Sequence, residues 1–78
     1  MKLLTESDAK KLTDLVTVPW IEILRCEGGF SAELRSMSSH KVGVLSTARG
    51  SVRVFKTLDS LTKVAEKIGV AYVSYSFK

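Results

Sequence analysis

The chain contains very few of the side chains that build disulfide bonds, zinc sites or catalytic centres. Its 78 residues include a single cysteine, Cys26, and a single histidine, His40. One cysteine excludes an intrachain disulfide. One cysteine and one histidine are also too few to supply the four clustered ligands of a structural zinc site. Stability must therefore come from packing of the apolar residues, 45% of the chain, or from association between copies. We expect one domain over residues 1–78, without a cofactor or metal and with a tendency to form homodimers.

Long apolar runs are also absent. Leu3 and Leu4 are the only consecutive apolar side chains near the start, which is too short for the core of a secretory signal. No run approaches the ~20 apolar residues that a membrane-spanning helix requires. Together with the sparing use of cysteine, these features predict a cytoplasmic protein that has no membrane partner.

Acidic side chains are missing from the middle of the chain. No Asp or Glu occurs in residues 34–58, and residues 1–33 carry a net charge of −2 while residues 34–78 carry +6. The acid-free stretch also contains serines and threonines, whose hydroxyl groups donate hydrogen bonds to phosphate oxygens. This uneven distribution favours a negatively charged partner for the second half of the chain.

The first element is expected to be a helix over residues 6–16. Thr5 is a suitable N-cap, and Asp8 follows three residues later, as in a capping box. Pro19 ends the helix because it restricts Val18 to extended geometry. Apolar side chains at helical spacing give this helix one apolar face, made of Ala9, Leu12, Leu15 and Val16.

Residues 20–27 and 30–35 have the alternation of a β-hairpin around the turn Gly28-Gly29. That turn places Ile23 opposite Leu34, and Glu22 opposite Arg35. The Glu22–Arg35 pair is of opposite sign, as cross-strand pairs prefer. The apolar side chains then share the other face, which consists of Ile21, Ile23, Phe30, Ala32 and Leu34.

After a polar loop over residues 36–41, the pattern predicts a second hairpin. Its strands cover residues 42–48 and 51–56, and Arg49-Gly50 forms the turn.

Residues 57–60 are expected to begin a second helix, with Thr57 or Asp59 as its N-cap, and Gly69 is expected to end it. Its apolar stripe consists of Leu58, Leu61, Val64, Ala65 and Ile68. The alternating residues 70–78 predict a last strand. The fold class is therefore α+β, with an antiparallel sheet of four to five strands, two packed helices and the order α-β-β-β-β-α-β.

Basic side chains on the second hairpin and beside it suggest a nucleic-acid interface. Cations along a two-stranded ribbon neutralise phosphates, and such a ribbon fits the major groove of DNA. Tyr72 shares a face with Ser74 and Ser76, so it is a candidate for stacking on a base. The candidate contacts to nucleic acid are Arg35, Lys41, Arg49, Arg53 and Lys56, with Arg49 at the hairpin tip. We expect a small DNA- or RNA-binding accessory or regulatory protein, with DNA preferred.

The same basic residues also fit a protein partner. An inhibitor or adaptor would dock them on an acidic surface, or would add a strand through an exposed sheet edge. Soluble proteins with a net charge of +4 also place lysines on solvated faces without any partner.

No combination of residues points to an enzyme. His40 lies in a serine-rich loop and has no nucleophile or carboxylate close to it in the sequence, so a solvated side chain is expected. Arg25 and Glu27 flank Cys26 and offset one another, which favours a packed cysteine over a reactive one. Gly28-Gly29 is not followed by the Gly-Lys-Ser/Thr of a phosphate-binding loop.

Two segments carry a resemblance to known proteins. Gly28-Gly29-Phe30, followed by residues 49–59 (RGSVRVFKTLD) and an amphipathic helix, resembles small accessory proteins of plasmids and other mobile elements. Residues 42–68 are similar in outline to the arm-type DNA-binding domains of tyrosine recombinases, in which a three-stranded sheet enters the major groove and a helix packs behind it. The resemblance covers about a third of the chain and implies DNA binding through the second hairpin. This chain departs from that pattern by its N-terminal helix and its C-terminal strand.

Overall fold

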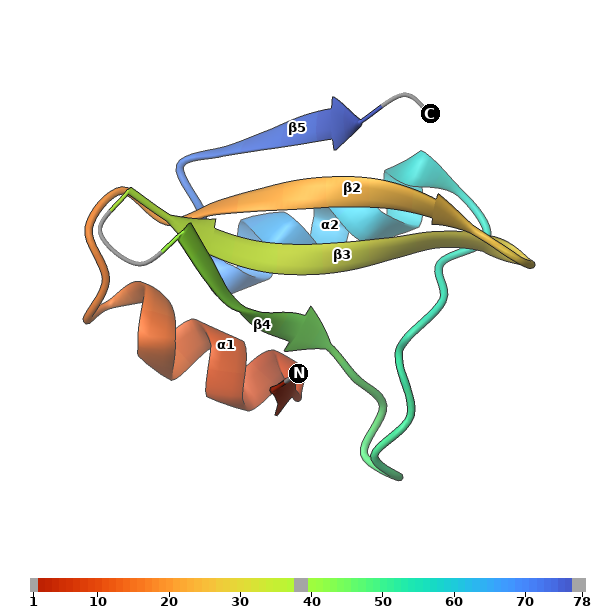
Figure 1. Cartoon of the computed structure of the whole chain (residues 1–78), viewed down its shortest axis with the longest axis horizontal. Coiled ribbons are helices and arrows are strands. Elements are labelled where there is room, and N and C mark those ends of the chain that lie inside the picture. The colour runs from red at the N-terminus through yellow and green to blue at the C-terminus, as the bar shows by residue number, and fades with distance from the viewer. Residues whose placement is uncertain (1, 38–39, 77–78) are drawn as a thin grey trace.

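The computed structural model describes residues 2–37 and 40–76 and shows a small α+β fold (Figure 1). The elements follow one another as β-α-β-β-β-α-β. They are β1 (Leu3–Leu4), α1 (Glu6–Thr13), β2 (Trp20–Cys26), β3 (Gly29–Ser36), β4 (His40–Leu45), α2 (Leu58–Ile68) and β5 (Tyr72–Ser76). The expected order α-β-β-β-β-α-β was wrong in two places: a two-residue strand precedes the first helix, and three strands, not four, separate the two helices.

The five strands form one mixed sheet in the order β1-β4-β3-β2-β5. β3 runs antiparallel to β2 and to β4, whereas β1 is parallel to β4 and β5 is parallel to β2. The prediction of a purely antiparallel sheet was therefore wrong. Each helix carries the chain back along the sheet, so the strand after it runs in the same direction as the strand before it.

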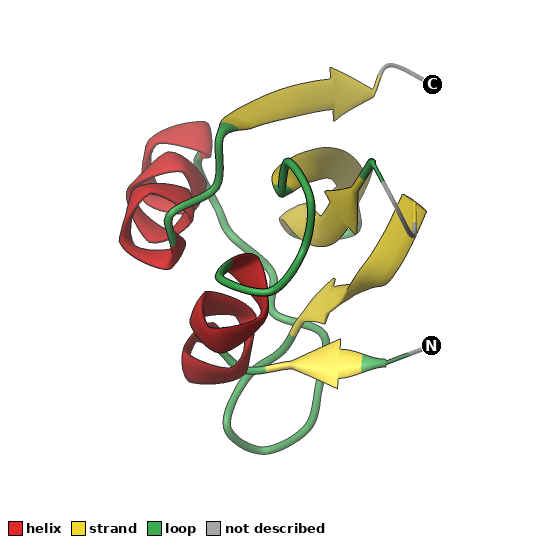
Figure 2. Cartoon of the chain, turned by 90° about the vertical axis from the view of Figure 1, so that its left-hand side faces the viewer, coloured by secondary structure: helices red, strands yellow, loops and turns green. Residues whose placement is uncertain are grey.

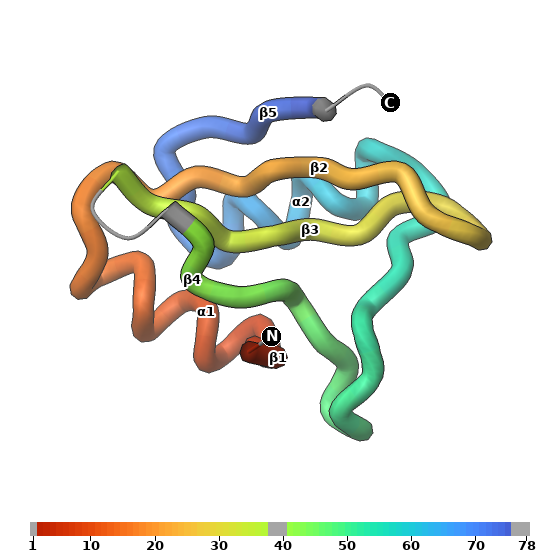
Figure 3. Tube along the Cα trace, viewed as in Figure 1, coloured from red at the N-terminus to blue at the C-terminus, as the bar shows by residue number. Residues whose placement is uncertain are grey.

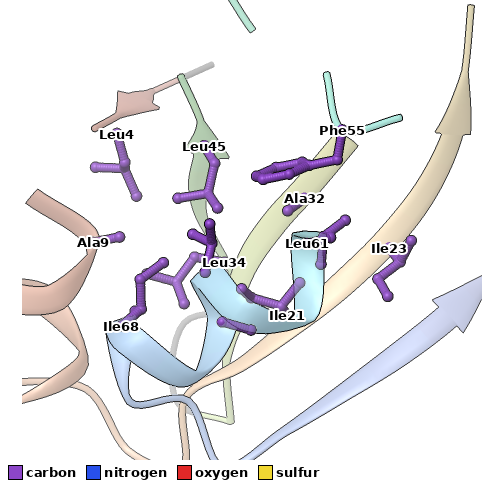
Figure 4. Packing of buried hydrophobic residues seen from close by; sticks show 12 residues of the cluster. Leu4, Ala9, Ile21, Ile23, Ala32, Leu34, Leu45, Phe55, Leu61 and Ile68 are labelled. Carbon is purple, nitrogen blue, oxygen red and sulfur yellow. The ribbon is translucent and has the colours of Figure 1, made fainter. Parts of the chain in front are cut away.

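Both helices lie against one face of the sheet and leave the other face uncovered by helices (Figure 2). Their apolar sides meet the sheet in a single core, in which Ile21, Ala32, Leu34 and Leu61 have no exposed surface (Figure 4). The faces expected for the first hairpin are therefore correct.

Helix α1 has the expected beginning but an earlier end. The Thr5 hydroxyl accepts a hydrogen bond from the Asp8 N–H, and the Asp8 carboxylate accepts one from the Thr5 N–H, which confirms the capping box. The helix ends at Thr13. The Thr13 hydroxyl lies between two carbonyl oxygens that share its proton, those of Lys10, at 2.8 Å, and Ile68, at 2.9 Å, so it ties the end of α1 to the end of α2. Leu15, expected on the apolar face, is 79% exposed.

Val18 adopts a left-handed backbone, with φ of +48°, where extended geometry was expected. Pro19 excludes the right-handed helical region for Val18, and the tight turn from α1 into β2 takes the left-handed region instead. A β-branched residue is strained there. We expect Val18→Gly to raise the free energy of unfolding by about 1 kcal/mol, and Thr17→Gly, where φ is not positive, to lower it. Urea unfolding followed by the fluorescence of Trp20 measures both, and a loss of stability in Val18→Gly would contradict the strain.

Helix α2 agrees closely with the sequence pattern. Thr57 is its N-cap and accepts a hydrogen bond from the Ser60 N–H at 3.1 Å. Gly69 ends it in the left-handed region, with φ of +91°. Leu58 was expected in the apolar stripe but is 41% exposed, while the rest of the stripe is buried, namely Leu61, Val64, Ala65 and Ile68.

The first hairpin is present in a register that differs from the predicted one by two residues. Glu27 and Gly28 form the turn, so Ile23 lies opposite Ala32 and not Leu34. A shift of two keeps every side chain on its face. The predicted Glu22–Arg35 pair was wrong, however, because Glu22 lies opposite Glu33.

The second hairpin exists only in part. Ser46 and Val52 form an isolated antiparallel bridge, and the Thr47 N–H bonds the Ser51 carbonyl oxygen at 2.8 Å. Further along the chain, the Phe55 N–H donates to the carbonyl oxygen of Phe30 in β3, and the Phe30 N–H donates to the carbonyl oxygen of Phe55. We call residues 46–56 the arm, which extends away from the sheet in Figure 3.

Strand β1 reaches β4 through a close contact at Gly43. A Cβ atom there would lie 2.8 Å from Leu4 Cδ1 and 2.9 Å from the Lys2 carbonyl oxygen. Glycine therefore allows Leu3 and Leu4 to pair with Val44 and Leu45, and Leu4 enters the core. In the last strand, β5 begins at Tyr72 rather than at residue 70, and Phe77 and Lys78 lie outside the described residues.

Candidate functional site

The basic side chains proposed as contacts do not form one cluster in the structure. Arg35 and Lys41 lie on strands β3 and β4, whereas the other three belong to the arm, namely Arg49, Arg53 and Lys56. We call the sheet face opposite the helices the open face; it includes Trp20, Glu33, Arg35 and Tyr72.

On the open face, Glu33 holds both basic side chains. The Arg35 guanidinium donates to Glu33 Oε1 at 2.8 Å, and Lys41 Nζ lies 2.8 Å from Glu33 Oε2. The Glu33 side chain is only 5% exposed, against 30% for Arg35 and 44% for Lys41. Glu33 therefore neutralises Arg35 and Lys41, two of the basic residues that the sequence pattern suggested as contacts to a binding partner.

These contacts perturb the ionisation of Glu33. Burial raises the pKa of its carboxyl, but hydrogen bonds from Lys41 and Arg35, with their positive charges, outweigh burial and leave the pKa below its ordinary value. A depressed pKa adds stability that is fully present above the unfolded-state pKa, about 4.3, and is lost as pH falls through the lower folded value.

Removing the Glu33 charge is therefore expected to weaken the fold. We expect Glu33→Gln to lower the free energy of unfolding by about 1–2 kcal/mol at neutral pH, because the three charge-assisted hydrogen bonds from Arg35 Nε, Arg35 Nη2 and Lys41 Nζ are weakened or lost. The control is Glu22→Gln, a half-buried neighbour on the same face with no ion pair among the described residues, for which less than ~0.5 kcal/mol is expected. As pH falls below about 4.3, the difference in the free energy of unfolding between the wild type and Glu33→Gln, measured by urea unfolding, should shrink, and it should vanish below the depressed folded-state pKa of Glu33. A difference that persists below that folded value contradicts the assignment.

A row of flat side chains crosses the open face next to this cluster. The rings of Tyr72 and Trp20 are stacked, with centroids 5.6 Å apart and planes within 7°. The Arg35 guanidinium lies 5.9 Å from the centroid of the Trp20 ring. Tyr72 is 48% exposed, in agreement with the alternation, and its ring already has an aromatic partner on one side. Trp20 Nε1 is buried and has no hydrogen-bond partner among the residues that the structure describes.

The basic residues of the arm differ in the contacts that they make with other residues of the chain. Arg53 Nη1 lies 3.5 Å from Glu6 Oε1, and its guanidinium lies 4.7 Å from the centroid of the Phe55 ring. The Arg53–Glu6 pair is partly exposed on both sides, so it contributes ~1 kcal/mol or less. Arg49 and Lys56 are exposed, and neither makes an ion pair within the part of the chain that the structure describes.

A shallow depression separates the base of the arm from the beginning of α1. Its volume is about 400 Å³, and it is lined by Thr5, Glu6 and Ser7 on one side and by Ser46, Thr47, Ala48 and Arg53 on the other. Hydroxyl groups and one guanidinium suit an anion, but the Glu6 carboxylate beside Arg53 offsets that charge. The depression therefore does not extend the basic surface of the arm.

The other sequence candidates lie apart from these groups. His40 begins β4 and pairs with Ser36, while its side chain is outside what the structure describes. Cys26 ends β2 and is half-buried, as expected of a strand cysteine. Among residues 2–37 and 40–76, no three His, Cys, Asp or Glu side chains gather as metal ligands would.

The sequence reasoning missed the role of Glu33. The available signal was its spacing of two from Arg35, since residues two apart in a strand share a face. The predicted hairpin register paired Arg35 with Glu22, so Glu33 was not considered as the partner of Arg35.

Within the described ranges no helix has the length and apolar character needed to cross a membrane. Comparisons with protein-family models, with curated proteins and with solved structures find no match to this chain.

Proposed function

We propose that the protein is a small nucleic-acid-binding protein, with DNA as the preferred ligand, and that the arm makes the contact. The observation that carries the proposal is the projection of the acid-free arm from the sheet (Figure 3). Arg49 is exposed within the turn of the arm that the hydrogen bond from the Gly50 N–H to the Thr47 carbonyl oxygen closes. The proposed contact residues are Arg49, Arg53 and Lys56.

The arrangement of the arm suits contacts to phosphates. Counterion release favours cations spread along an extended segment, and no carboxylate of the arm opposes them. The Phe30–Phe55 hydrogen bonds, 2.7 and 2.8 Å long, attach the base of the arm to the sheet and reduce the ordering needed on binding. Arg35 and Lys41 are omitted from the proposed contact because Glu33, whose side chain is buried, holds both at 2.8 Å. Arg53 is retained because its pair with Glu6 is longer, 3.5 Å, and partly exposed on both sides, so a phosphate can replace the carboxylate.

The proposal predicts salt-dependent binding that one substitution weakens strongly. If each of the three cations neutralises one phosphate, the logarithm of the affinity should fall with the logarithm of salt with a slope of about −3. Arg49→Glu should weaken binding by ~10-fold or more and reduce the slope by about 1. Arg25→Glu changes the same charge on an exposed residue of β2 and should leave affinity within about twofold.

Fluorescence anisotropy with labelled duplex and single-stranded DNA at several salt concentrations measures these quantities. Absence of binding at low salt would overturn the proposal. Equal effects of Arg49→Glu and Arg25→Glu would also overturn the assignment to the arm, since a response to net charge alone does not depend on position.

A second candidate partner is an acidic protein surface. The observation that favours it is the contact between Arg53 and the Glu6 carboxylate, which shows that the arm accommodates this kind of group. A pull-down from lysate with and without nuclease separates the two classes. Capture that survives nuclease and is lost in Arg49→Glu, combined with no binding to DNA, supports the protein partner.

A further inference from the structure

Strand β5 is a free edge of the sheet. It pairs with β2 on one side, and no described strand lies on its other side. An edge strand offers backbone N–H and C=O groups for pairing with another chain, and proteins commonly block such edges with charge, proline or bulges. The sequence of β5, Tyr-Val-Ser-Tyr-Ser, contains no charged residue and no proline, and its register with β2 is continuous.

Apolar surface is exposed along both faces of this edge. Tyr72 is 48% exposed on the open face, while Val73 and Tyr75, which point to the helix side, are 39% and 37% exposed. Figures 1 and 2 show the reason: α2 lies behind β2 and β3, and β5 lies beyond its cover. Additional strands beside β5 would cover these side chains.

We propose that β5 pairs antiparallel with β5 of a second copy of this chain across a two-fold axis, so that two sheets join into one. The properties of the strand select a second copy over other occupants. Each chain has a net charge of +4, yet the meeting strands are uncharged, so their pairing places no like charges opposite each other. Two-fold pairing is also the commonest symmetry of soluble oligomers.

The pairing of β5 with itself is chemically favourable. Ser74 is the middle residue of β5, so an axis beside it pairs the strand over its whole length and places the two Ser74 residues opposite each other. Val73 then lies opposite Tyr75 of the second copy, a β-branched and aromatic pair of the kind that stabilises sheets. A small core gains most from such added burial.

The dimer is compatible with the proposed function but does not depend on it. The arm leaves the sheet after β4, on the other side of β3 and β2 from β5 (Figure 1). Both arms would therefore remain accessible at the two far ends of the joined sheet.

Sedimentation velocity over micromolar concentrations tests the dimer. The wild type should be dimeric and Val73→Lys monomeric, because lysine places like charges near the axis. The matched control is Val52→Lys, which alters a valine of similar exposure, 44%, in the arm and should remain dimeric. Circular dichroism should show that all three are folded. A monomeric wild type, or a dimer that persists in Val73→Lys, overturns the proposal.

Cysteine cross-linking tests the same interface without relying on a disruptive variant. In a Cys26→Ser background, Ser74→Cys should form a disulfide-linked dimer on mild oxidation, since residues opposite each other near the axis are within reach. Thr62→Cys, on the exposed side of α2, should stay mostly monomeric. Equal cross-linking of the two variants contradicts the pairing, as does cross-linking of Ser74→Cys only to other proteins in lysate. DNA binding is read separately by anisotropy, so either proposal can fail alone.

Discussion

Replacing Phe55 by alanine should cost about 3–5 kcal/mol of the free energy of unfolding, a large part of the stability of a small domain. Phe55 is only 4% exposed although it lies outside every helix and strand. Its ring fills the core near Ala32 and Leu61, and it supports the Arg53 guanidinium at 4.7 Å (Figure 4). Alanine would leave a cavity where the arm returns to the sheet.

Urea unfolding followed by Trp20 fluorescence and by circular dichroism measures the loss. The control is Val54→Ala, one residue earlier, where 44% exposure predicts a cost of about 0.5 kcal/mol. If Phe55→Ala and Val54→Ala cost the same, the burial of Phe55 is wrong, and with it the rigid base proposed for the arm.

Gly29→Ala should lower the free energy of unfolding by about 2–4 kcal/mol, because the backbone of Phe55 and Lys56 passes close to Gly29. A Cβ atom on Gly29 would overlap the carbonyl oxygen of Phe55 and lie 3.2 Å from Lys56 Cα. Both are backbone atoms, so no side-chain rotation relieves the overlap. Gly29 also has φ of +151°, which L residues rarely adopt.

Gly50→Ala separates the overlap from the backbone preference. Gly50 has φ of +87°, but a Cβ atom there would have no neighbour within 4 Å in the described part of the chain. It should therefore cost only the conformational penalty, about 1 kcal/mol. Equal costs at the two glycines, measured by urea unfolding, would show that the arm does not approach Gly29 closely.

The second helix and the faces of the first hairpin were predictable because local patterns determine them. Thr57 and Gly69 are cap residues whose effect acts within one turn, and the stripe between them has helical period. The hairpin register, in contrast, was two residues off. Sliding the strands by two preserves the faces, so alternation alone could not tell Gly28-Gly29 from Glu27-Gly28 as the turn.

The mixed sheet was not predictable from local patterns. Leu3 and Leu4 are too few to show any periodicity, and they form a strand only because Gly43 lets them approach β4. Similarly, residues 51–56 alternate like a strand, yet they form only isolated bridges because Phe55 pairs with Phe30. Pairing over long sequence separations decided both cases.

By itself, the sequence determined the presence of the two helices with their N-caps, the buried face of the β2–β3 hairpin, and the charge asymmetry, in which residues 34–58 contain no Asp or Glu. Composition and short-range periodicity are properties of neighbouring residues, so they can be read without a fold. Tertiary structure decided which cations are available to a partner. Folding brings Glu33 against Arg35 and Lys41, and Glu6 against Arg53, while Arg49 and Lys56 are exposed without an ion pair to a described residue. The physical reason is that an ion pair depends on distance in space. Sequence spacing indicates that distance within one strand, as for Glu33 and Arg35, but not across strands or between a helix and the arm.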